Sequence, residues 1–245
     1  MIEQLTPNVV ASVGTLVTAL LAILGFLGVG RYLIEPELQA RDLKKKYATA
    51  LWISCNELRR HLKRIEAQIK GNETDSINSL RKLPDKNFNG AADWFTKEGY
   101  YASITAYKIS VVSSWLQIYK QELLFSTVRR SRSFFGVLYA RGEHLKSSFS
   151  EGTEFWPDYF DAIGCKLIDI KSTPPRPLDF AKFCECYFEN LQFRKFYDQL
   201  HMFIWFIADG KNLPHVEKAR DALLQLMRFL EAQNLLPGLK TEIEA

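Results

Sequence analysis

The chain has 245 residues, of which 47 per cent are hydrophobic and 13 per cent aromatic, and its formal net charge is +4. This composition excludes a disordered polypeptide, because disordered chains carry too few apolar side chains to form a core. The small charge excess argues against a dedicated nucleic-acid-binding protein, which needs a strongly basic surface to neutralise phosphates.

The first predicted element is an apolar segment near the N-terminus. No charged residue lies between Glu3 and Arg31, and the residues from Val9 to Gly30 would span roughly 33 Å as a helix, the thickness of a hydrocarbon core. Its non-aliphatic residues are Gly, Ser and Thr, which membranes tolerate. The segment predicts a retained transmembrane helix within an N-terminal region of residues 1–34.

Two other interpretations of this segment remain open. A cleaved signal peptide would have a basic start and a shorter apolar core, whereas the residues "MIEQLTPN" include an acid and no Lys or Arg. A buried helix of a soluble domain is usually shorter and carries a polar stripe. Both fit the sequence less well than a membrane anchor.

Basic residues follow the apolar segment, and none precedes it. The Lys/Arg asymmetry therefore places the N-terminus outside and the C-terminal part in the cytoplasm, at the inner (plasma) membrane of a bacterium. The lipid bilayer is the first expected partner. The basic residues on the cytoplasmic side are Arg31, Arg41, Lys44, Lys45 and Lys46.

One face of the apolar segment carries small residues at helical spacing, namely Gly14, Thr18, Ala22 and Gly25. Such a stripe lets two membrane helices approach closely, which predicts a homo-oligomer. The alternative is that small residues are simply common in membrane helices.

Residues 35–236 predict an all-α cytoplasmic bundle, and residues 237–245 a C-terminal tail. The first helix has Pro36 in its first turn and ends at Gly71, with a weak position at Ser54. Its apolar stripe consists of Leu43, Tyr47, Leu51, Leu58, Leu62, Ile65 and Ile69. The polar residues 71–95 predict the longest loop.

Three further helices are expected between residues 98 and 170. The first has an apolar pattern through Tyr101, Ile104, Val111, Trp115, Ile118 and Leu123. The second, over residues 127–149, is weakened by Gly136 and Gly142. The third begins near Pro157 and ends before "STPPRP", whose prolines cannot continue a helix.

Two helices are expected in the remainder of the chain. One runs without a break over residues 178–208, and its "LHMFIWFIA" is too short to cross a membrane and predicts a core segment. The last covers residues 215–234, with Asn212 as its candidate cap and Pro214 in its first turn.

No catalytic residue, cofactor or metal site is predicted. The Cys residues lack zinc spacing and are expected to be reduced, and the familiar nucleophile and phosphate-loop motifs are missing from the sequence. Among the histidines, His61 is expected on a basic surface, whereas His201 lies among apolar residues and is better explained as a core residue than as an acid–base group. Asp158 and Asp161 resemble acids that complement a helix N-terminus.

Two basic clusters are candidates for contact with lipid headgroups or an anionic partner, together with the basic residues that follow the anchor. A solvated surface is the alternative, and without an aromatic stacking platform we do not expect nucleic acid as the partner. The clusters are Arg59, Arg60, Lys63 and Arg64, and Arg129, Arg130 and Arg132.

The plan of the chain resembles a group of bacterial single-pass membrane proteins with an all-helical cytoplasmic domain. The resemblance rests on an N-terminal anchor followed by "WFTKEGYYASITAYKISVVSSWLQIYKQEL", "FWPDYFDAIGCKLIDI" and "RDALLQLMRFLEAQ". It implies the fold and the location, and it brings no activity or binding residue.

We therefore expect a membrane-anchored helical module for binding, scaffolding or signalling, acting through oligomerisation and a possible protein partner. One alternative is a membrane-disrupting or channel-like effector that the cytoplasmic domain controls. The other is an enzyme with an unrecognised active site.

Overall fold

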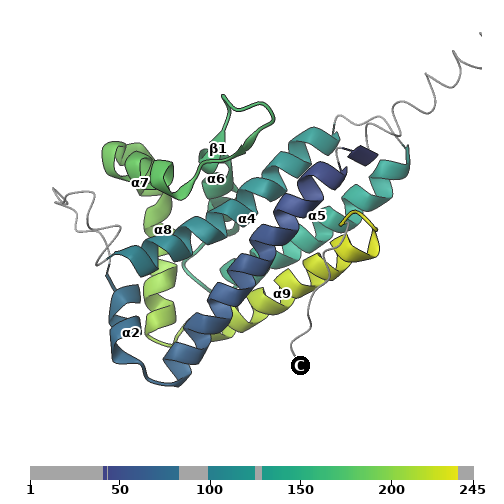
Figure 1. Cartoon of the computed structure of the whole chain (residues 1–245). Coiled ribbons are helices and arrows are strands. Elements are labelled where there is room, and N and C mark those ends of the chain that lie inside the picture. Colours follow the sequence, from purple (N-terminus) through teal and green to yellow (C-terminus); the bar gives the residue numbers. More distant parts are fainter. Residues whose placement is uncertain (1–40, 43, 83–98, 125–128, 237–245) are drawn as a thin grey trace, which may run out of the picture. The chain divides into compact units, whose positions relative to one another are not determined.

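The computed structural model describes residues 41–42, 44–82, 99–124 and 129–236 (Figure 1). The chain divides into two compact units, Met1–Leu43 and Lys44–Ala245. Of the first unit only Arg41 and Asp42 are described, and both are helical and exposed. The described part of the second unit is almost entirely helical, which confirms the all-α prediction.

The first helix of the second unit covers residues 44–70, and Gly71 follows it as predicted. Tyr47, Leu51 and Leu58 of the expected stripe are buried. The fully buried Cys55 fills the weak position, because steps of four and three from Leu51 lead through residue 55 to residue 58. Trp52 adds to the buried face and donates from Nε1 to the carboxylate of Glu231 at 2.9 Å.

The predicted loop after Gly71 contains a short helix, α2 (Thr74–Leu80). Its last residue, Leu80, is fully buried. The prediction of a continuous loop was therefore wrong at this point, because the polar composition concealed one apolar anchor. The last part of that predicted loop, residues 83–95, lies outside the described residues.

Helix α4 (Tyr100–Leu124) lies at the centre of the unit (Figure 1). The apolar face predicted for it was largely wrong: Tyr101, Ile104, Val111 and Trp115 are only half-buried. The residues of its deep core are Ala102, Ala106, Ile109, Val112, Leu116, Ile118 and Tyr119. Neighbouring helices cover α4 on several sides, so its buried surface is wider than one stripe.

Helix α5 (Arg129–Ser150) follows, and α6 (Pro157–Leu167) crosses α4 at close range. At the crossing, Ser113 Oγ donates to the carbonyl of Phe160 at 2.6 Å, and Ser114 Oγ donates to the carbonyl of Gly164 at 2.9 Å. A Cβ atom added to Gly164 would lie 2.2 Å from Ser113 Oγ. Only glycine permits this approach of the two helices.

Beyond α6 the chain forms a two-residue antiparallel ladder between β1 (Ile168–Asp169) and β2 (Arg176–Pro177). Next come α7 (Phe180–Glu189) and α8 (Leu191–Ala208), where one continuous helix was predicted. Asn190 breaks that helix, because its side chain accepts hydrogen bonds from the backbone N–H groups of Gln192 and Phe193 and so starts a new one. The "LHMFIWFIA" segment belongs to the core of α8, as predicted.

Helix α9 (Leu213–Ala232) has Pro214 in its first turn, as expected. Asn212 occupies the N-cap position but does not cap the helix. Its side-chain amide instead donates to the carbonyl of Phe203 at 3.2 Å, which ties the start of α9 to α8.

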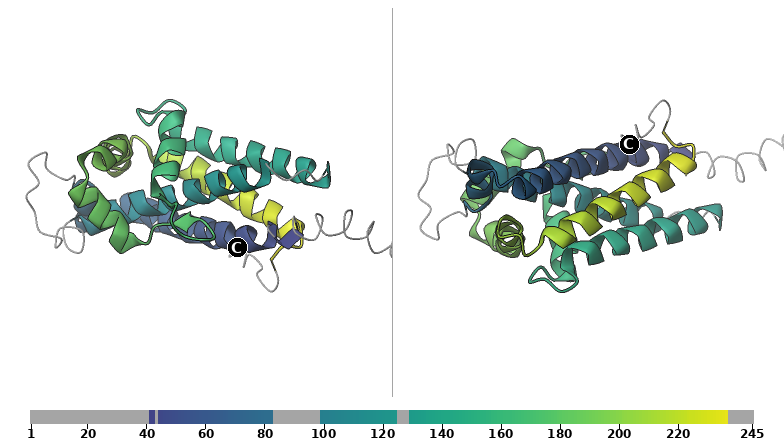
Figure 2. Two further views of the ribbon diagram at one scale, coloured as in Figure 1. Left: turned by 90° about the horizontal axis from the view of Figure 1, so that it is seen from above. Right: turned by 90° about the horizontal axis from the view of Figure 1, so that it is seen from below.

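The helix over residues 44–70 forms a four-helix bundle with α4, α5 and α9 (Figures 1 and 2). Contacts show that it runs antiparallel to α4, since Tyr47 packs on Tyr119 and His61 on Thr105. It also runs antiparallel to α9, and α9 runs antiparallel to α5. The helix over 44–70 and α5 therefore begin at the same end of the bundle, where α4 and α9 finish.

Candidate functional site

Basic residues gather at this shared end of the bundle, which we call the basic end. It consists of residues 44–47, 119–124, 129–134 and 227–232 (Figure 2). Eight basic and two acidic residues fall in these segments, whereas the whole chain has 32 and 28. The basic ones are Lys44, Lys45, Lys46, Lys120, Arg129, Arg130, Arg132 and Arg228, and the acidic ones are Glu122 and Glu231.

Aromatic rings pack beneath the basic end and hold its four segments together. Tyr47 contacts Tyr119 at a centroid distance of 5.9 Å, and Tyr119 contacts Phe134 at 6.4 Å. Phe134 in turn stacks on Phe229 at 5.2 Å. One ring cluster thus links the helix over 44–70 to α4, α5 and α9, so the positions of the basic residues depend on the packed core.

Two lysines of the basic end lie over these rings. Lys44 Nζ is 5.0 Å from the centre of Phe134, and Lys46 Nζ is 5.4 Å from the centre of Tyr47. Tyr119 also donates from its hydroxyl to the carbonyl of Lys44 at 2.7 Å. Burial lowers the pKa of Lys44 from its usual value. Cations over aromatic faces are attracted by the ring quadrupole, which favours this arrangement.

The structure brings two of the predicted basic groups together. Arg129, Arg130 and Arg132 belong to the first turn of α5, and the buried Phe134 fixes that turn beside Lys44. These groups are more than eighty positions apart in the sequence. Periodicity could not have indicated their proximity, because it depends on the antiparallel order of the four helices.

The cluster of Arg59, Arg60, Lys63 and Arg64 lies elsewhere. Fifteen residues separate Lys45 from Arg60, which corresponds to about 22 Å along the helix. Arg60, Lys63 and Arg64 are exposed, and Arg59 is half-buried. This cluster therefore does not belong to the basic end.

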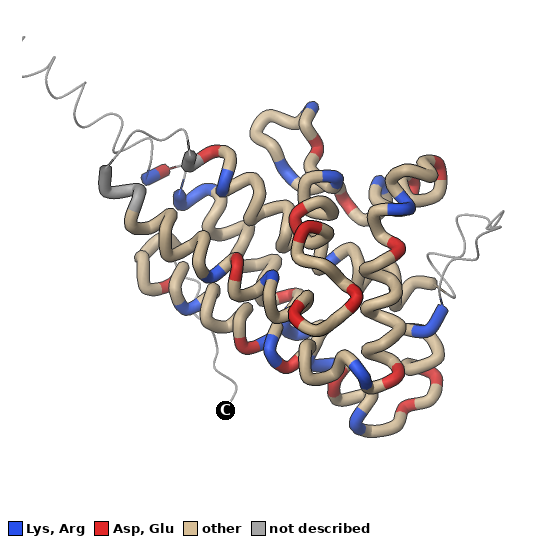
Figure 3. Tube along the Cα trace, turned by 180° about the vertical axis from the view of Figure 1, so that it is seen from behind, with Lys and Arg blue, Asp and Glu red and all other residues tan. Residues whose placement is uncertain are grey.

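The bundle's other end mixes charges of both signs, as Figure 3 shows. Lys70 bonds to Glu217 at 2.9 Å, and Arg81 bonds to Asp209 at 2.8 Å. Arg220 pairs with Glu66. The two ends therefore differ in charge, since the basic end has a clear excess of positively charged residues.

The prediction of His61 on a basic surface was wrong. His61 is buried, with Nε2 2.8 Å from Thr105 Oγ1 and its ring edge-on to Tyr101. Burial and the nearby cations of Lys108 and Arg64 lower its pKa to about 4. Its position four residues before Ile65 on the buried stripe could have indicated this.

His201 is a core residue, in line with the preferred interpretation of the sequence. It is 3 per cent exposed, and its Nδ1 lies 3.2 Å from the hydroxyl of Tyr187. Burial lowers its pKa to about 4, so the imidazole is neutral at ordinary pH. Both buried histidines therefore contribute to packing and local hydrogen bonding.

A half-buried charge network, missed at the sequence level, joins α4, α5 and α6. Lys146 bonds to Glu143 at 2.7 Å and to Asp161 at 3.0 Å. Lys120 bonds to Glu143 at 3.3 Å, and Gln117 donates to Asp161 at 2.7 Å. Asp161 thus connects three helices, contrary to the prediction that it complements a helix N-terminus. Asp158 lies in the first turn of α6 as expected.

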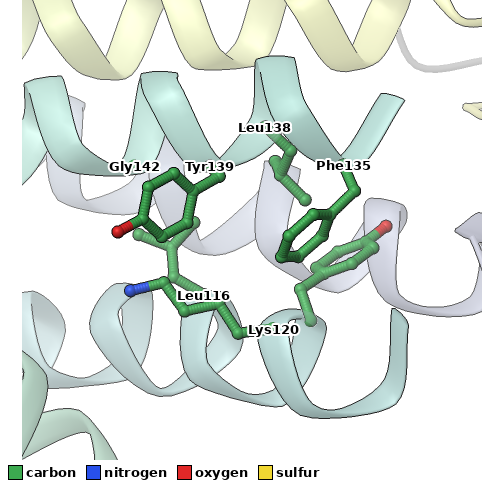
Figure 4. Close-up of a pocket in the computed structure, with 7 residues that line it drawn as sticks. Leu116, Lys120, Phe135, Leu138, Tyr139 and Gly142 are labelled. Carbon is green, nitrogen blue, oxygen red and sulfur yellow. The ribbon is translucent and has the colours of Figure 1, made fainter. Parts of the chain in front are cut away.

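A small apolar cavity lies beside this network, between α4 and α5 (Figure 4). Its volume of about 10 Å³ leaves room for no more than one water molecule. It is lined by Leu116, Tyr119, Lys120, Phe135, Leu138, Tyr139 and Gly142. Lys120 lies over the ring of Tyr139 at 5.0 Å, so the cavity is a packing gap between the helices.

A wider hollow of about 240 Å³ lies between α2 and the start of α4. It is lined by Asp75, Ser76, Ser79, Tyr100 and Tyr101. Tyr101 donates its hydroxyl to the side chain of Gln68. These five residues supply hydroxyl groups and one carboxylate to the hollow.

The four cysteines are free thiols, and Cys165 is the exposed one. Burial raises the pKa of the Cys55 and Cys184 thiols, the latter to about 12. Within residues 41–42, 44–82, 99–124 and 129–236, no group of three or more His, Cys, Asp or Glu side chains could hold a metal ion.

The predicted membrane segment, with Gly14, Thr18, Ala22, Gly25 and Arg31, lies outside the described residues. In the part of the chain that is described, no helix is both long and apolar enough to cross a bilayer. The transmembrane helix and its packing stripe therefore stay predictions.

The chain matches no family model, and comparisons with curated proteins and with solved structures find no similar protein.

Proposed function

We propose that this protein is a single-pass membrane protein whose cytoplasmic helical bundle serves as a binding or scaffolding module. The N-terminus would lie outside the inner membrane of a bacterium, and the bundle inside. The observation that carries the proposal is the basic end. The residues that follow the apolar segment, Lys44 to Lys46, share this end with the first turn of α5.

A role in binding macromolecules is supported by the character of the bundle. The half-buried carboxylates of Glu143 and Asp161 are each bonded to lysines, which is an arrangement that joins helices. The cavity between α4 and α5 holds at most one water molecule, and the hollow of about 240 Å³ between α2 and α4 is also smaller than the roughly 300–1,000 Å³ of small-molecule sites. The exposed surface of the bundle is therefore the better candidate for function.

Membrane attachment can be tested by fractionating cells that express the full chain. We expect the protein to stay with membranes through an alkaline carbonate wash and to be released only by detergent, because a spanning helix is held by hydrophobic burial. Recovery in the carbonate supernatant would refute the anchor.

The orientation can be tested with the natural thiols. Cys165 is exposed on α6, so a membrane-impermeant maleimide should label it only after the inner membrane is opened. Cys165→Ser is the matched control for label on the buried or half-buried cysteines. Labelling of intact spheroplasts at Cys165 would reverse the proposed orientation.

Oligomerisation through the apolar segment is a separate part of the proposal. Gly14→Leu and Thr18→Leu should shift the full chain in mild detergent from an oligomer to a monomer, because leucine prevents close helix approach. Leu16→Ala is the control on the same segment. If all variants have the same size as the wild type, the small-residue stripe does not mediate assembly.

A further inference from the structure

The basic end carries its charge on side chains from four segments of the bundle. Lys120 is engaged with Glu143 and Asp161. Among the basic residues of these segments whose side chains are described, Lys46 and Arg228 are exposed, and Lys44 and Lys45 are half-buried. Glu231 accepts a hydrogen bond from Trp52.

The geometry of the bundle lets only one of its two basic clusters meet a flat anionic surface when the helices stand on that surface. Lys45 and Arg60 are about 22 Å apart along one helix, whereas the Debye length at physiological salt is about 8 Å. Salt therefore screens Arg60 from an anionic surface that is in contact with Lys45.

We infer that the basic end is a docking surface for anionic phospholipid headgroups, on which the bundle stands with its four helices roughly along the membrane normal. The inference rests on the proposed function, because the membrane segment is what would bring the bundle to the leaflet. Lysines and arginines next to an anionic leaflet are attracted to its headgroups. The buried rings of Phe134 and Tyr47 hold the side chains of Lys44 and Lys46 at this end of the bundle.

The test places the full chain in two kinds of nanodisc and follows amide hydrogen exchange. The neutral discs contain phosphatidylcholine alone, and the anionic discs contain about one third phosphatidylglycerol. In anionic discs we expect the amides of residues 47–50 and 133–136 to exchange about tenfold more slowly, because docking suppresses opening at this end. Residues 59–64 and 213–220 should exchange equally in both discs. Salt of about 0.5 M should remove the difference.

Matched variants test whether the protection depends on the basic end or on positive charge anywhere on the bundle. Lys44→Gln/Lys45→Gln/Lys46→Gln should abolish the slower exchange, and Arg60→Gln/Lys63→Gln/Arg64→Gln should keep it. Lys45→Gln/Lys46→Gln, which leaves Lys44 on the Phe134 ring, should lose part of the protection and guards against misfolding of the triple variant. Circular dichroism spectra of all variants should match the wild type.

Three results would overturn the inference: equal exchange in both discs, loss of protection in the Arg60 variant, or removal of protection by duplex DNA added to the anionic discs. The last would assign the surface to nucleic acid. A chain that fails to enter discs and is washed from membranes by carbonate would instead refute the proposed function, so the two failures are distinguishable.

Discussion

The crossing of α4 and α6 predicts that Gly164→Ala destabilises the protein. The added Cβ would lie 2.2 Å from Ser113 Oγ and 2.8 Å from the carbonyl carbon of Ser113. The second contact is with backbone, so rotation of a side chain cannot relieve it. The helices must separate, which weakens the bonds from Ser113 to Phe160 and from Ser114 to Gly164.

The magnitude follows from these contacts. Overpacking a core by one methyl group typically costs about 1–3 kcal/mol, and each weakened hydrogen bond about 1 kcal/mol more. The higher helix propensity of alanine offsets about 1 kcal/mol of this loss. We expect a net loss of about 3 kcal/mol in the free energy of unfolding. A matched control is Gly136→Ala in α5, where no atom lies within 4 Å of the added Cβ. This control should gain about 0.5–1 kcal/mol.

Thermal unfolding followed by circular dichroism measures both variants. For a domain of this size, about 3 kcal/mol corresponds to a Tm lower by roughly 6–12 °C, whereas Gly136→Ala should raise the Tm by about 1–4 °C. If Gly164→Ala unfolds at or above the wild-type temperature while Gly136→Ala behaves as expected, the close approach of α4 and α6 is not as described.

Three further predictions concern stability. The pKa values of His61 and His201 fall to about 4 on folding, so the unfolded chain binds protons more readily between pH 6.5 and 4. Lowering the pH from 7 to 5 should therefore reduce the free energy of unfolding by about 2 kcal/mol per histidine. In urea titrations His61→Gln should reduce that loss by this amount, and an unchanged loss would argue against the burial of His61. Asn190→Ala should lower stability by about 1 kcal/mol through loss of the α8 cap, while Asn190→Asp should preserve it; equal melting of the two variants would contradict the capping role. Lys146→Met should lower the free energy of unfolding by about 2 kcal/mol, because it leaves two half-buried carboxylates with fewer partners. A double-mutant cycle with Asp161→Asn should show coupling between the two positions; no coupling would mean that the Lys146–Asp161 contact at 3.0 Å contributes nothing to stability.

Much of the helical plan could be predicted from local pattern. The steps of three and four through Leu51, Leu58 and Leu62 located the first helix, and Gly71 located its end. The break at Asn190 was missed, because the apolar periodicity of residues 178–208 continues across it. The break depends on one side chain, that of Asn190, which caps α8. The buried face of α4 was missed because small residues such as Ser113 and Ala106 are buried by neighbours that a pattern within one helix cannot reveal.

The sequence by itself determined the helical class of the described unit, since helical periodicity and glycine or proline boundaries act over a few residues. It also supplied the basic residues and the apolar N-terminal segment as candidates. Only the tertiary structure decided that Lys44 and the first turn of α5 share one end of the bundle, while Arg60 lies about 24 Å from Lys44 along the helix. The reason is that the direction and pairing of helices are set by contacts between distant residues, such as Phe134 with Phe229, which leave no periodic trace in the chain.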